Sequence, residues 1–125
     1  MQGAGARLLI ATSKRRRFAV RILEHLGLAA MFDGIHGSED GGALDEKSDL
    51  IAHIMAHHAL RRDHCVMVGD RRHDILGAKV NGVRSLGVLW GYGTSEELTT
   101  AGATGLIAHP ADLPAATLGK AQNCA

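Results

Sequence analysis

The stretch that decides the fold is VMVGDRRHD, residues 66–74. An apolar run ends at Gly69 and Asp70, and a second acid, Asp74, follows four positions later. If the run is a buried strand and a helix follows, Asp70 lies at the carboxyl end of the strand and Asp74 one helical turn further on, facing the same way. Two carboxylates at that edge of a parallel sheet form a hard-oxygen site suited to Mg²⁺. Alone the pattern is weak, because Asp70 can simply cap the helix and Asp74 can be an exposed acid.

Short apolar runs alternate with segments of helical period along the rest of the chain. We expect strands at residues 7–11, 32–37, 65–69, 84–90 and 106–109, and helices at 16–26, 46–60, 74–80 and from 94 or 95 to 101. Gly27 and the pair Asn81-Gly82 are expected to end two of these helices. The alternation predicts an α/β fold with a parallel sheet and right-handed crossovers.

Length and composition narrow the class of protein. The 125 residues predict one domain, residues 1–125, and 46% hydrophobic with only 3% aromatic residues predicts an aliphatic core. A formal charge of +1 gives no general attraction to nucleic acid, and two cysteines fit a reducing compartment. No apolar stretch approaches the roughly 20 residues of a membrane span, and no signal peptide precedes Arg7. We therefore expect a soluble, cytoplasmic protein that binds neither nucleic acid nor membrane.

Two further segments strengthen the interpretation of the aspartate pair. Thr12 and Ser13 stand just past the first expected strand, where hydroxyls and backbone N–H groups suit an anionic oxygen, although either residue could simply cap the next helix. Lys47 opens the second expected helix, where a cation opposes the helix dipole. An exposed lysine is the ordinary explanation, but one in an unfavourable position is a candidate anion ligand.

In this order, the Thr12 segment, Lys47 and the Asp70–Asp74 pair resemble the second, third and fourth motifs of the haloacid dehalogenase (HAD) superfamily of phosphotransferases. The nearest branch is the phosphoglycolate phosphatase and 5′-nucleotidase-like one, which the phrases ATSK (11–14), VGDR (68–71) and GVLWGYG (87–93) resemble. The similarity runs from about Leu8 to Leu113. It implies a Rossmann-like core, a parallel sheet with flanking helices.

The resemblance also implies a mechanism for a small phosphorylated metabolite. An aspartate attacks the phosphoryl group, a second acid two residues on transfers protons, and water hydrolyses the aspartyl-phosphate. By this resemblance Asp70 and Asp74 hold Mg²⁺ or its water ligands. Thr12, with Ser13 beside it, binds phosphoryl oxygen, and Lys47 neutralises the charge of the phosphate and the nucleophile.

The nucleophile motif of the family, Asp-x-Asp-Gly-Thr, is missing from these residues. No Asp-x-Asp occurs in the 125 residues, and only six residues precede the first expected strand. The chain therefore resembles the C-terminal part of such an enzyme, without the first, central strand and the cap: a truncated gene, an expressed fragment or a remnant. We expect weak or no activity alone. The vacant strand position predicts a homodimer, a complementing segment, rearranged pairing or marginal stability.

Other chemically capable residues have simpler explanations. His53 and His57 have the i, i+4 spacing of a metal pair, but a polar helix face is the favoured interpretation because no third ligand is evident. The basic run 14–17 could bind phosphate or nucleic acid, and a solvated helix start is preferred. A non-catalytic subunit that associates through strand pairing stays open as the alternative function.

Overall fold

Strands and helices alternate along the chain, as the sequence predicts. The structure is a computed structural model that describes residues 7–42 and 44–113. The strands are β1 (Leu9–Arg15), β2 (Gly34–Ser38), β3 (Val66–Gly69), β4 (Arg84–Val88) and β5 (Gly105–Ile107). The helices are α1 (Arg16–His25), α2 (Lys47–His57), α3 (Arg72–Val80) and α4 (Ser95–Ala101). Short 3₁₀ turns lie at Ala29–Met31, Arg62–His64 and Pro110–Asp112.

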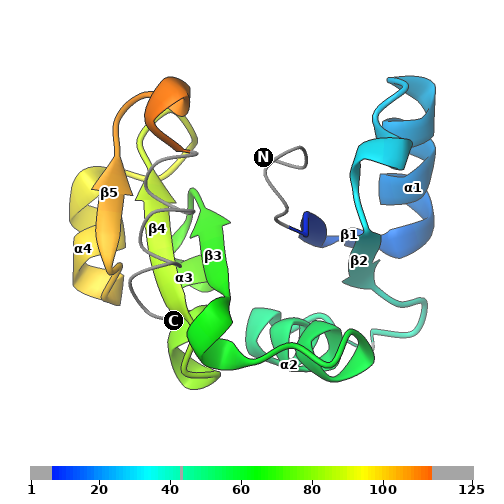
Figure 1. The fold of residues 1–125 in the computed structure, drawn as a ribbon, viewed down its shortest axis with the longest axis horizontal. Coiled ribbons are helices and arrows are strands. Elements are labelled where there is room, and N and C mark those ends of the chain that lie inside the picture. Colours follow the sequence, from blue (N-terminus) through cyan, green and yellow to red (C-terminus); the bar gives the residue numbers. More distant parts are fainter. Residues whose placement is uncertain (1–6, 43, 114–125) are drawn as a thin grey trace.

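The five strands form two separate parallel sheets. One sheet has the order β1-β2 and the other β3-β4-β5. In the part of the chain that the structure describes, no strand joins β1 to β3, and Figure 1 shows the two sheets apart with α2 spanning the space below them. The α/β class with parallel strands is confirmed. Among the described residues, β1 and β3 each have a strand neighbour on one side only.

The core is aliphatic and is centred on the three-stranded sheet. Ile75 of α3 packs with Leu98 and Ala101 of α4, while Leu86 packs with Val88 and Ile107 within the sheet. Burying such side chains stabilises the fold by about 1.5–3 kcal/mol each. The sequence of residues 46–60 predicts an apolar helix face made of Leu50, Ile51, Ile54 and Met55. The structure confirms it, since the first three are buried and Met55 packs against the cluster around Ile51.

Two expectations about the N-terminal half need correction. The first strand was expected at residues 7–11, but β1 runs to Arg15 and α1 follows without a loop. The helical period of residues 16–26 predicts one apolar face made of Phe18, Ile22, Leu23 and Leu26, but Phe18, Ile22 and Leu26 are exposed and the buried residue is Ala19. The cause is geometric, because the two-stranded sheet is too narrow to cover a full helical face.

The two helix ends that the sequence predicted from Gly27 and Asn81-Gly82 are confirmed, whereas α2 ends at His57 and not at residue 60. Gly27 and Gly82 have φ of +72° and +71°, a left-handed conformation that glycine adopts without steric cost, just after the ends of α1 and α3. Thr94 caps α4, and its Oγ1 accepts the N–H of Glu97 at 3.1 Å. None of the helices in the described residues is long and apolar enough to cross a membrane.

Candidate active site

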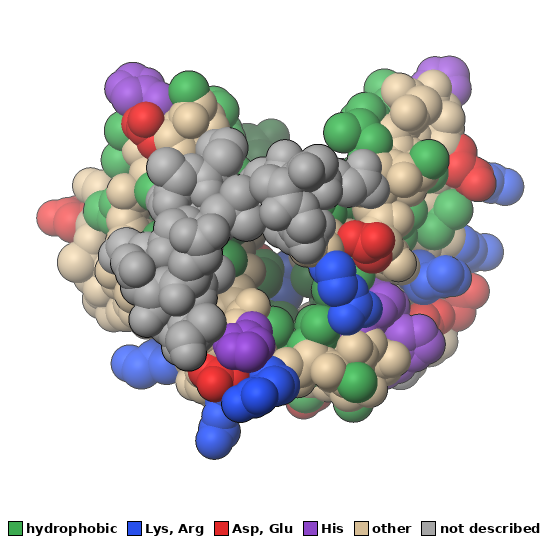
Figure 2. Space-filling model, viewed as in Figure 1, with side chains coloured by type: hydrophobic (Ala, Val, Ile, Leu, Met, Phe, Trp, Pro, Cys, Tyr) green, Lys and Arg blue, Asp and Glu red, His purple; other side chains and the backbone are tan. Residues whose placement is uncertain are grey.

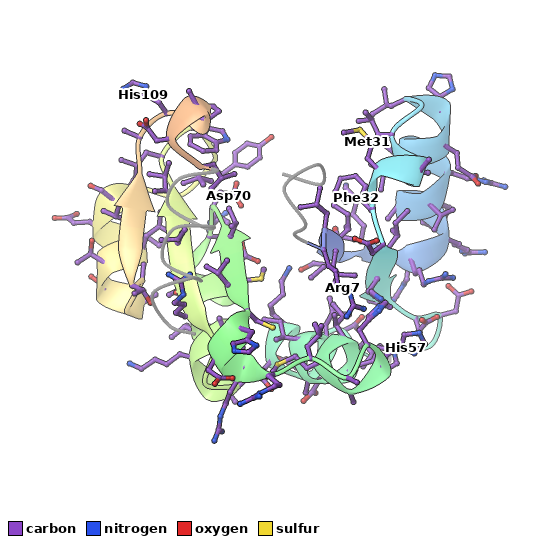
Figure 3. All side chains as sticks on the ribbon, viewed as in Figure 1. Arg7, Met31, Phe32, His57, Asp70 and His109 are labelled. Atoms are coloured by element: carbon purple, nitrogen blue, oxygen red, sulfur yellow. The ribbon has the colours of Figure 1, made fainter. Side chains whose placement is uncertain are left out.

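One cavity collects all five residues that the sequence nominates. It has a volume of about 480 Å³ and opens between the carboxyl ends of β1 and β3. Thr12, Ser13, Lys47, Asp70 and Asp74 line it, together with Ala11, Lys14, Val68, Gly69, Arg71, His73 and Tyr92. Asp70 lies on its β3 side, at the edge of the space between the two sheets (Figure 3). A larger hollow of about 660 Å³ between α3 and α4 includes none of the five.

The centre of the site is a buried ion pair between Lys47 and Asp74. The lysine Nζ lies 3.0 Å from Asp74 Oδ1, and the two side chains are 8% and 12% exposed. The same Nζ donates to the carbonyl oxygen of Ala11 at 2.9 Å. Lys47 is the first residue of α2, and its ion pair with Asp74 and its hydrogen bond to Ala11 explain how a cation is tolerated in the first turn. The ammonium group of Lys47 thereby links β1 to the first turn of α3.

Asp74 is fully engaged with neighbouring groups, whereas Asp70 is not. Oδ2 of Asp74 accepts the backbone N–H groups of Asp70 at 3.2 Å and Arg71 at 3.3 Å. For Asp70, Oδ2 accepts the N–H of Tyr92 at 3.0 Å, and its carbonyl accepts the N–H of Gly93 at 2.9 Å. Asp74 therefore orients the turn, and Asp70 presents its carboxylate to the cavity.

Glycines make this close packing possible. A Cβ at Gly69 would overlap the Asp74 side chain, and a Cβ at Gly91 would overlap the Asp70 side chain. A Cβ at Gly93 would overlap the carbonyl oxygen of Asp70. The phrase GVLWGYG, residues 87–93, thus supplies the backbone surface on which Asp70 rests.

The Thr12 side of the cavity is a bulge in β1. Thr12 pairs with Gly37 and Arg15 with Ser38, so Ser13 and Lys14 have no partner residue on β2. Thr12 Oγ1 accepts the N–H of Lys14 at 3.2 Å, which holds the bulged backbone in place. Bulges re-aim side chains and amides next to functional sites. The bulge therefore turns this end of β1 toward the cavity.

Charged residues around the cavity are mostly tied to neighbours. Arg15 donates to Ser38, Glu39 and Asp45, and the side chain of Arg17 lies 3.5 Å from that of Asp40. Much of the basic run 14–17 therefore holds the loop that follows β2. Glu97 accepts from the backbone N–H of Arg72 and from Arg71 Nε, each at 2.9 Å. These hydrogen bonds, the backbone one first, lower the pKa of Glu97.

The donor set fits a magnesium ion only in part. Asp70 offers a carboxylate at the mouth of the cavity, and oxygen donors are what Mg²⁺ prefers. Asp74 already pairs with Lys47 and two N–H groups, so it suits an outer role that holds the ligands in place. Within residues 7–42 and 44–113, no three His, Cys, Asp or Glu side chains are arranged to hold a metal.

A sequence model of the family described as haloacid dehalogenase-like hydrolase matches residues 1–88. The chain belongs to this family. The resemblance expected from Thr12, Lys47, Asp70 and Asp74 is therefore confirmed, and so is the branch, because relatives named 5′-nucleotidase and phosphoglycolate phosphatase are both found. The Rossmann-like core of HAD phosphatases is confirmed by the structural neighbours.

Individual relatives differ in the activity they are named for. A 5′-nucleotidase of Pseudomonas aeruginosa is 44% identical over 96 residues, which are 77% of this chain and 43% of that protein. Tyrosine-protein kinase PtkA of Mycobacterium tuberculosis is 37% identical over 113 residues, 90% of this chain and 38% of that protein. The crystal structure of a predicted phosphatase from Clostridium acetobutylicum superposes with a TM-score of 0.91 and 39% identity, covering 94% of this chain and 55% of that one.

This HAD chain spans about half the length of the relatives it matches or less. Sequence reasoning missed several parts of the site, because they are backbone groups: the Ala11 carbonyl that accepts from Lys47 and the Tyr92 N–H that donates to Asp70. The glycines of residues 87–93 were the sequence signal that could have revealed the Tyr92 N–H group as part of the site.

Proposed function

We propose that the chain carries the magnesium- and phosphate-binding half of a phosphomonoester hydrolase of the phosphoglycolate phosphatase-like kind, acting on a small phosphorylated metabolite in the cytoplasm. The observation that supports this most is that Thr12, Ser13, Lys47, Asp70 and Asp74 line one cavity. Family membership adds support, because proteins of this family with phosphatase names are among its relatives.

Each residue has a role that its surroundings suit. Asp70 is the proposed Mg²⁺ ligand, and the ion when bound would neutralise charge on the phosphoryl oxygens. Asp74 holds Lys47 and the Asp70 turn in position. Thr12, Ser13 and the bulged backbone bind phosphoryl oxygens, and Lys47 adds a positive charge that costs no reorganisation during the reaction.

The proposal includes a limit on turnover. None of the 125 residues forms the Asp-x-Asp pattern that the family uses as nucleophile and general acid. Without a covalent acceptor, these residues bind phosphate and metal but transfer no phosphoryl group. We therefore expect weak activity or none from this chain alone, with the missing group supplied by a complementing segment.

Phosphate binding and turnover test this proposal separately. With Mg²⁺ present, ³¹P NMR should show inorganic phosphate binding that Asp70→Asn and Thr12→Val weaken and that the exposed control Asp112→Asn leaves unchanged. Hydrolysis of p-nitrophenyl phosphate should stay near background. Binding that is insensitive to Asp70→Asn and Thr12→Val contradicts the proposed site. Turnover that Asp70→Asn abolishes would show instead that another residue has replaced the nucleophile.

The divided sheet favours a second candidate function, a non-catalytic subunit that associates through strands. Among the described residues, β1 pairs only with β2 and β3 only with β4. Residues near the carboxyl ends of both strands line the same cavity, so the two edges lie on either side of one space. Unpaired strand edges attract strand partners. The partner in this case is a second copy of the chain or a complementing segment.

Light scattering on the purified chain distinguishes this candidate. Strand-mediated association predicts a dimer or larger species whose mass falls on dilution. A well-folded monomer at all concentrations, with cooperative unfolding in urea, contradicts it.

A further inference from the structure

Four histidines gather where α2 meets β2, away from the phosphate cavity. His36 comes from β2, His53 and His57 from α2, and His58 follows the helix directly. Ring centroids are 5.0 Å apart for His36 and His58, 4.9 Å for His57 and His58, and 5.6 Å for His36 and His57. Histidine atoms lie together at this end of α2 in Figure 2, and Figure 3 places His57 there. The sequence revealed His53 and His57 as a pair but not the ring from β2.

The rings of His36 and His58 already face each other through their Nε2 atoms. The Nε2 atoms of His36 and His58 are 2.8 Å apart. Gly34 leaves room for this contact, since a Cβ there would lie 2.8 Å from His58 Nε2 and 2.9 Å from His36 Nε2. The strand thus omits a side chain at the point where the nitrogens converge.

The spacings of the ring centroids, unlike the short distance between the two Nε2 atoms, are close to those of imidazoles around one metal ion. With Zn–N bonds of about 2.0–2.1 Å and tetrahedral angles, ring centroids lie about 5 Å apart and ligand nitrogens about 3.4 Å apart. We propose that His36, His57 and His58 form a binding site for a divalent transition metal of the Zn²⁺ class. His53, whose centroid is 5.9 Å from those of both His36 and His57, is the fourth neighbour.

The site needs ring rotation but little backbone movement. In the described residues no three side chains present donor atoms in a ready metal-binding arrangement. The rings meet edge to face, at 84° for His36 and His58 and 74° for His57 and His58. His57 is exposed and His58 half-buried, so rotation about their side-chain bonds is not opposed by packing. An opening of about 0.6 Å between the two Nε2 atoms admits the ion.

Charges near the cluster are mixed. Burial, then the neighbouring histidines and Arg16, lower the pKa of His36 to about 4, so its ring is neutral at pH 7 and keeps a lone pair. Arg7 Nη2 lies 3.1 Å from His58 Nδ1, which favours a proton on Nε2 and competes with a metal there. The negative charge of Asp33 acts against the positive charge of Arg7: it raises the pKa of His58 and attracts a cation to this ring.

The chemistry of this cluster separates it from the phosphate cavity. Imidazole nitrogens favour Zn²⁺, Ni²⁺ and Cu²⁺, whereas the carboxylate of Asp70 favours Mg²⁺. None of the four histidines lines the cavity. The inference is therefore independent of the proposed phosphatase function, and each can fail without the other.

Metal titration of the untagged full chain tests the site. In excess Mg²⁺, which occupies oxygen sites, Co²⁺ should bind with one equivalent per chain and give the visible absorption of a tetrahedral ion, and Zn²⁺ should displace it. His57→Gln and His58→Gln should weaken binding by at least about tenfold, because even the loss of an outer-shell partner costs about 10–100-fold in affinity. His109→Gln, outside the cluster, is the matched control, and Asp70→Asn should leave this binding unchanged.

Folding is checked separately by circular dichroism of each variant. His57 is exposed, so its replacement leaves the core intact and keeps the test valid even if a His36 variant fails to fold. The absence of stoichiometric binding overturns the proposal. So does equal weakening by His109→Gln, or weakening by Asp70→Asn with no effect of His57→Gln.

Discussion

Lys47 and Asp74 form a buried ion pair, 3.0 Å from Nζ to Oδ1, that joins the first residue of α2 to the first turn of α3. The Ala11 carbonyl shares the same ammonium group. Removing the Lys47 ammonium group would leave the Asp74 carboxylate and the Ala11 carbonyl oxygen without this partner. This pair therefore serves stability as well as the proposed chemistry, and the two roles can be measured separately.

Replacing the lysine tests the stabilising role. Lys47→Met should lower the free energy of unfolding by about 3–5 kcal/mol, because removing one partner of a buried pair leaves the other charge uncompensated. Urea unfolding followed by circular dichroism measures it. Lys79→Met, which changes an exposed lysine of α3, should alter stability by no more than about 0.5 kcal/mol. Equal changes in the free energy of unfolding for the two variants would show that the Lys47–Asp74 pair makes no specific contribution to stability.

The two aspartates should differ in their response to Mg²⁺. Asp70→Asn should weaken Mg²⁺ binding strongly and change stability little, since its carboxylate faces the cavity and accepts one N–H. Asp74→Asn should do the reverse and mainly destabilise the chain, because Asp74 holds Lys47 and two backbone groups. Calorimetric titration and urea unfolding separate the effects. The reversed pattern would exchange the proposed roles.

Glycine 91 should be sensitive to a single added methyl group. Gly91→Ala places a Cβ against the Asp70 side chain and should destabilise the chain by about 1–3 kcal/mol while weakening Mg²⁺ binding. Gly105→Ala is the matched control, because its nearest neighbour is the flexible end of Leu86 at 3.2 Å. A smaller loss for Gly91→Ala than for Gly105→Ala, in unfolding and in binding, would contradict this account of the turn.

Glu97 should make stability depend on pH in the acid range. Its pKa is lowered in the folded chain, so its stabilising contribution is fully present above the unfolded pKa of about 4.5 and is lost as pH falls through the folded value. The stability difference between wild type and Glu97→Gln should therefore shrink on acidification. Urea unfolding at stepwise lower pH measures this. Glu96→Gln, an exposed neighbour, should show no such trend.

The sequence predicted the strands and helices, and it nominated five residues that line one cavity, because both depend on local pattern. Gly69-Asp70 and the start of α3 at Arg72 fix where Asp70 and Asp74 lie, whatever the rest of the sheet does. It could not predict that Asp74 pairs with Lys47, because the 26 intervening residues carry no local signal of that contact.

Two other features depended on the tertiary arrangement. The apolar face of α1 has a regular helical period, yet its burial depends on the width of the sheet below it, which local sequence does not encode. His36 lies on a different element from His53, His57 and His58, so only strand β2 packing near the end of α2 brings the four rings together.

The division into two sheets has a consequence for how the molecule opens. No backbone hydrogen-bond ladder crosses from β1 to β3 in the described residues, and the link there includes the Lys47 side chain and the packing of α2. Cooperative units in proteins tend to follow such boundaries. Amide hydrogen exchange should therefore separate into two protection classes, a slow one for β3, β4 and β5 and a faster one for β1 and β2. A strand inserted between the sheets would merge them into one.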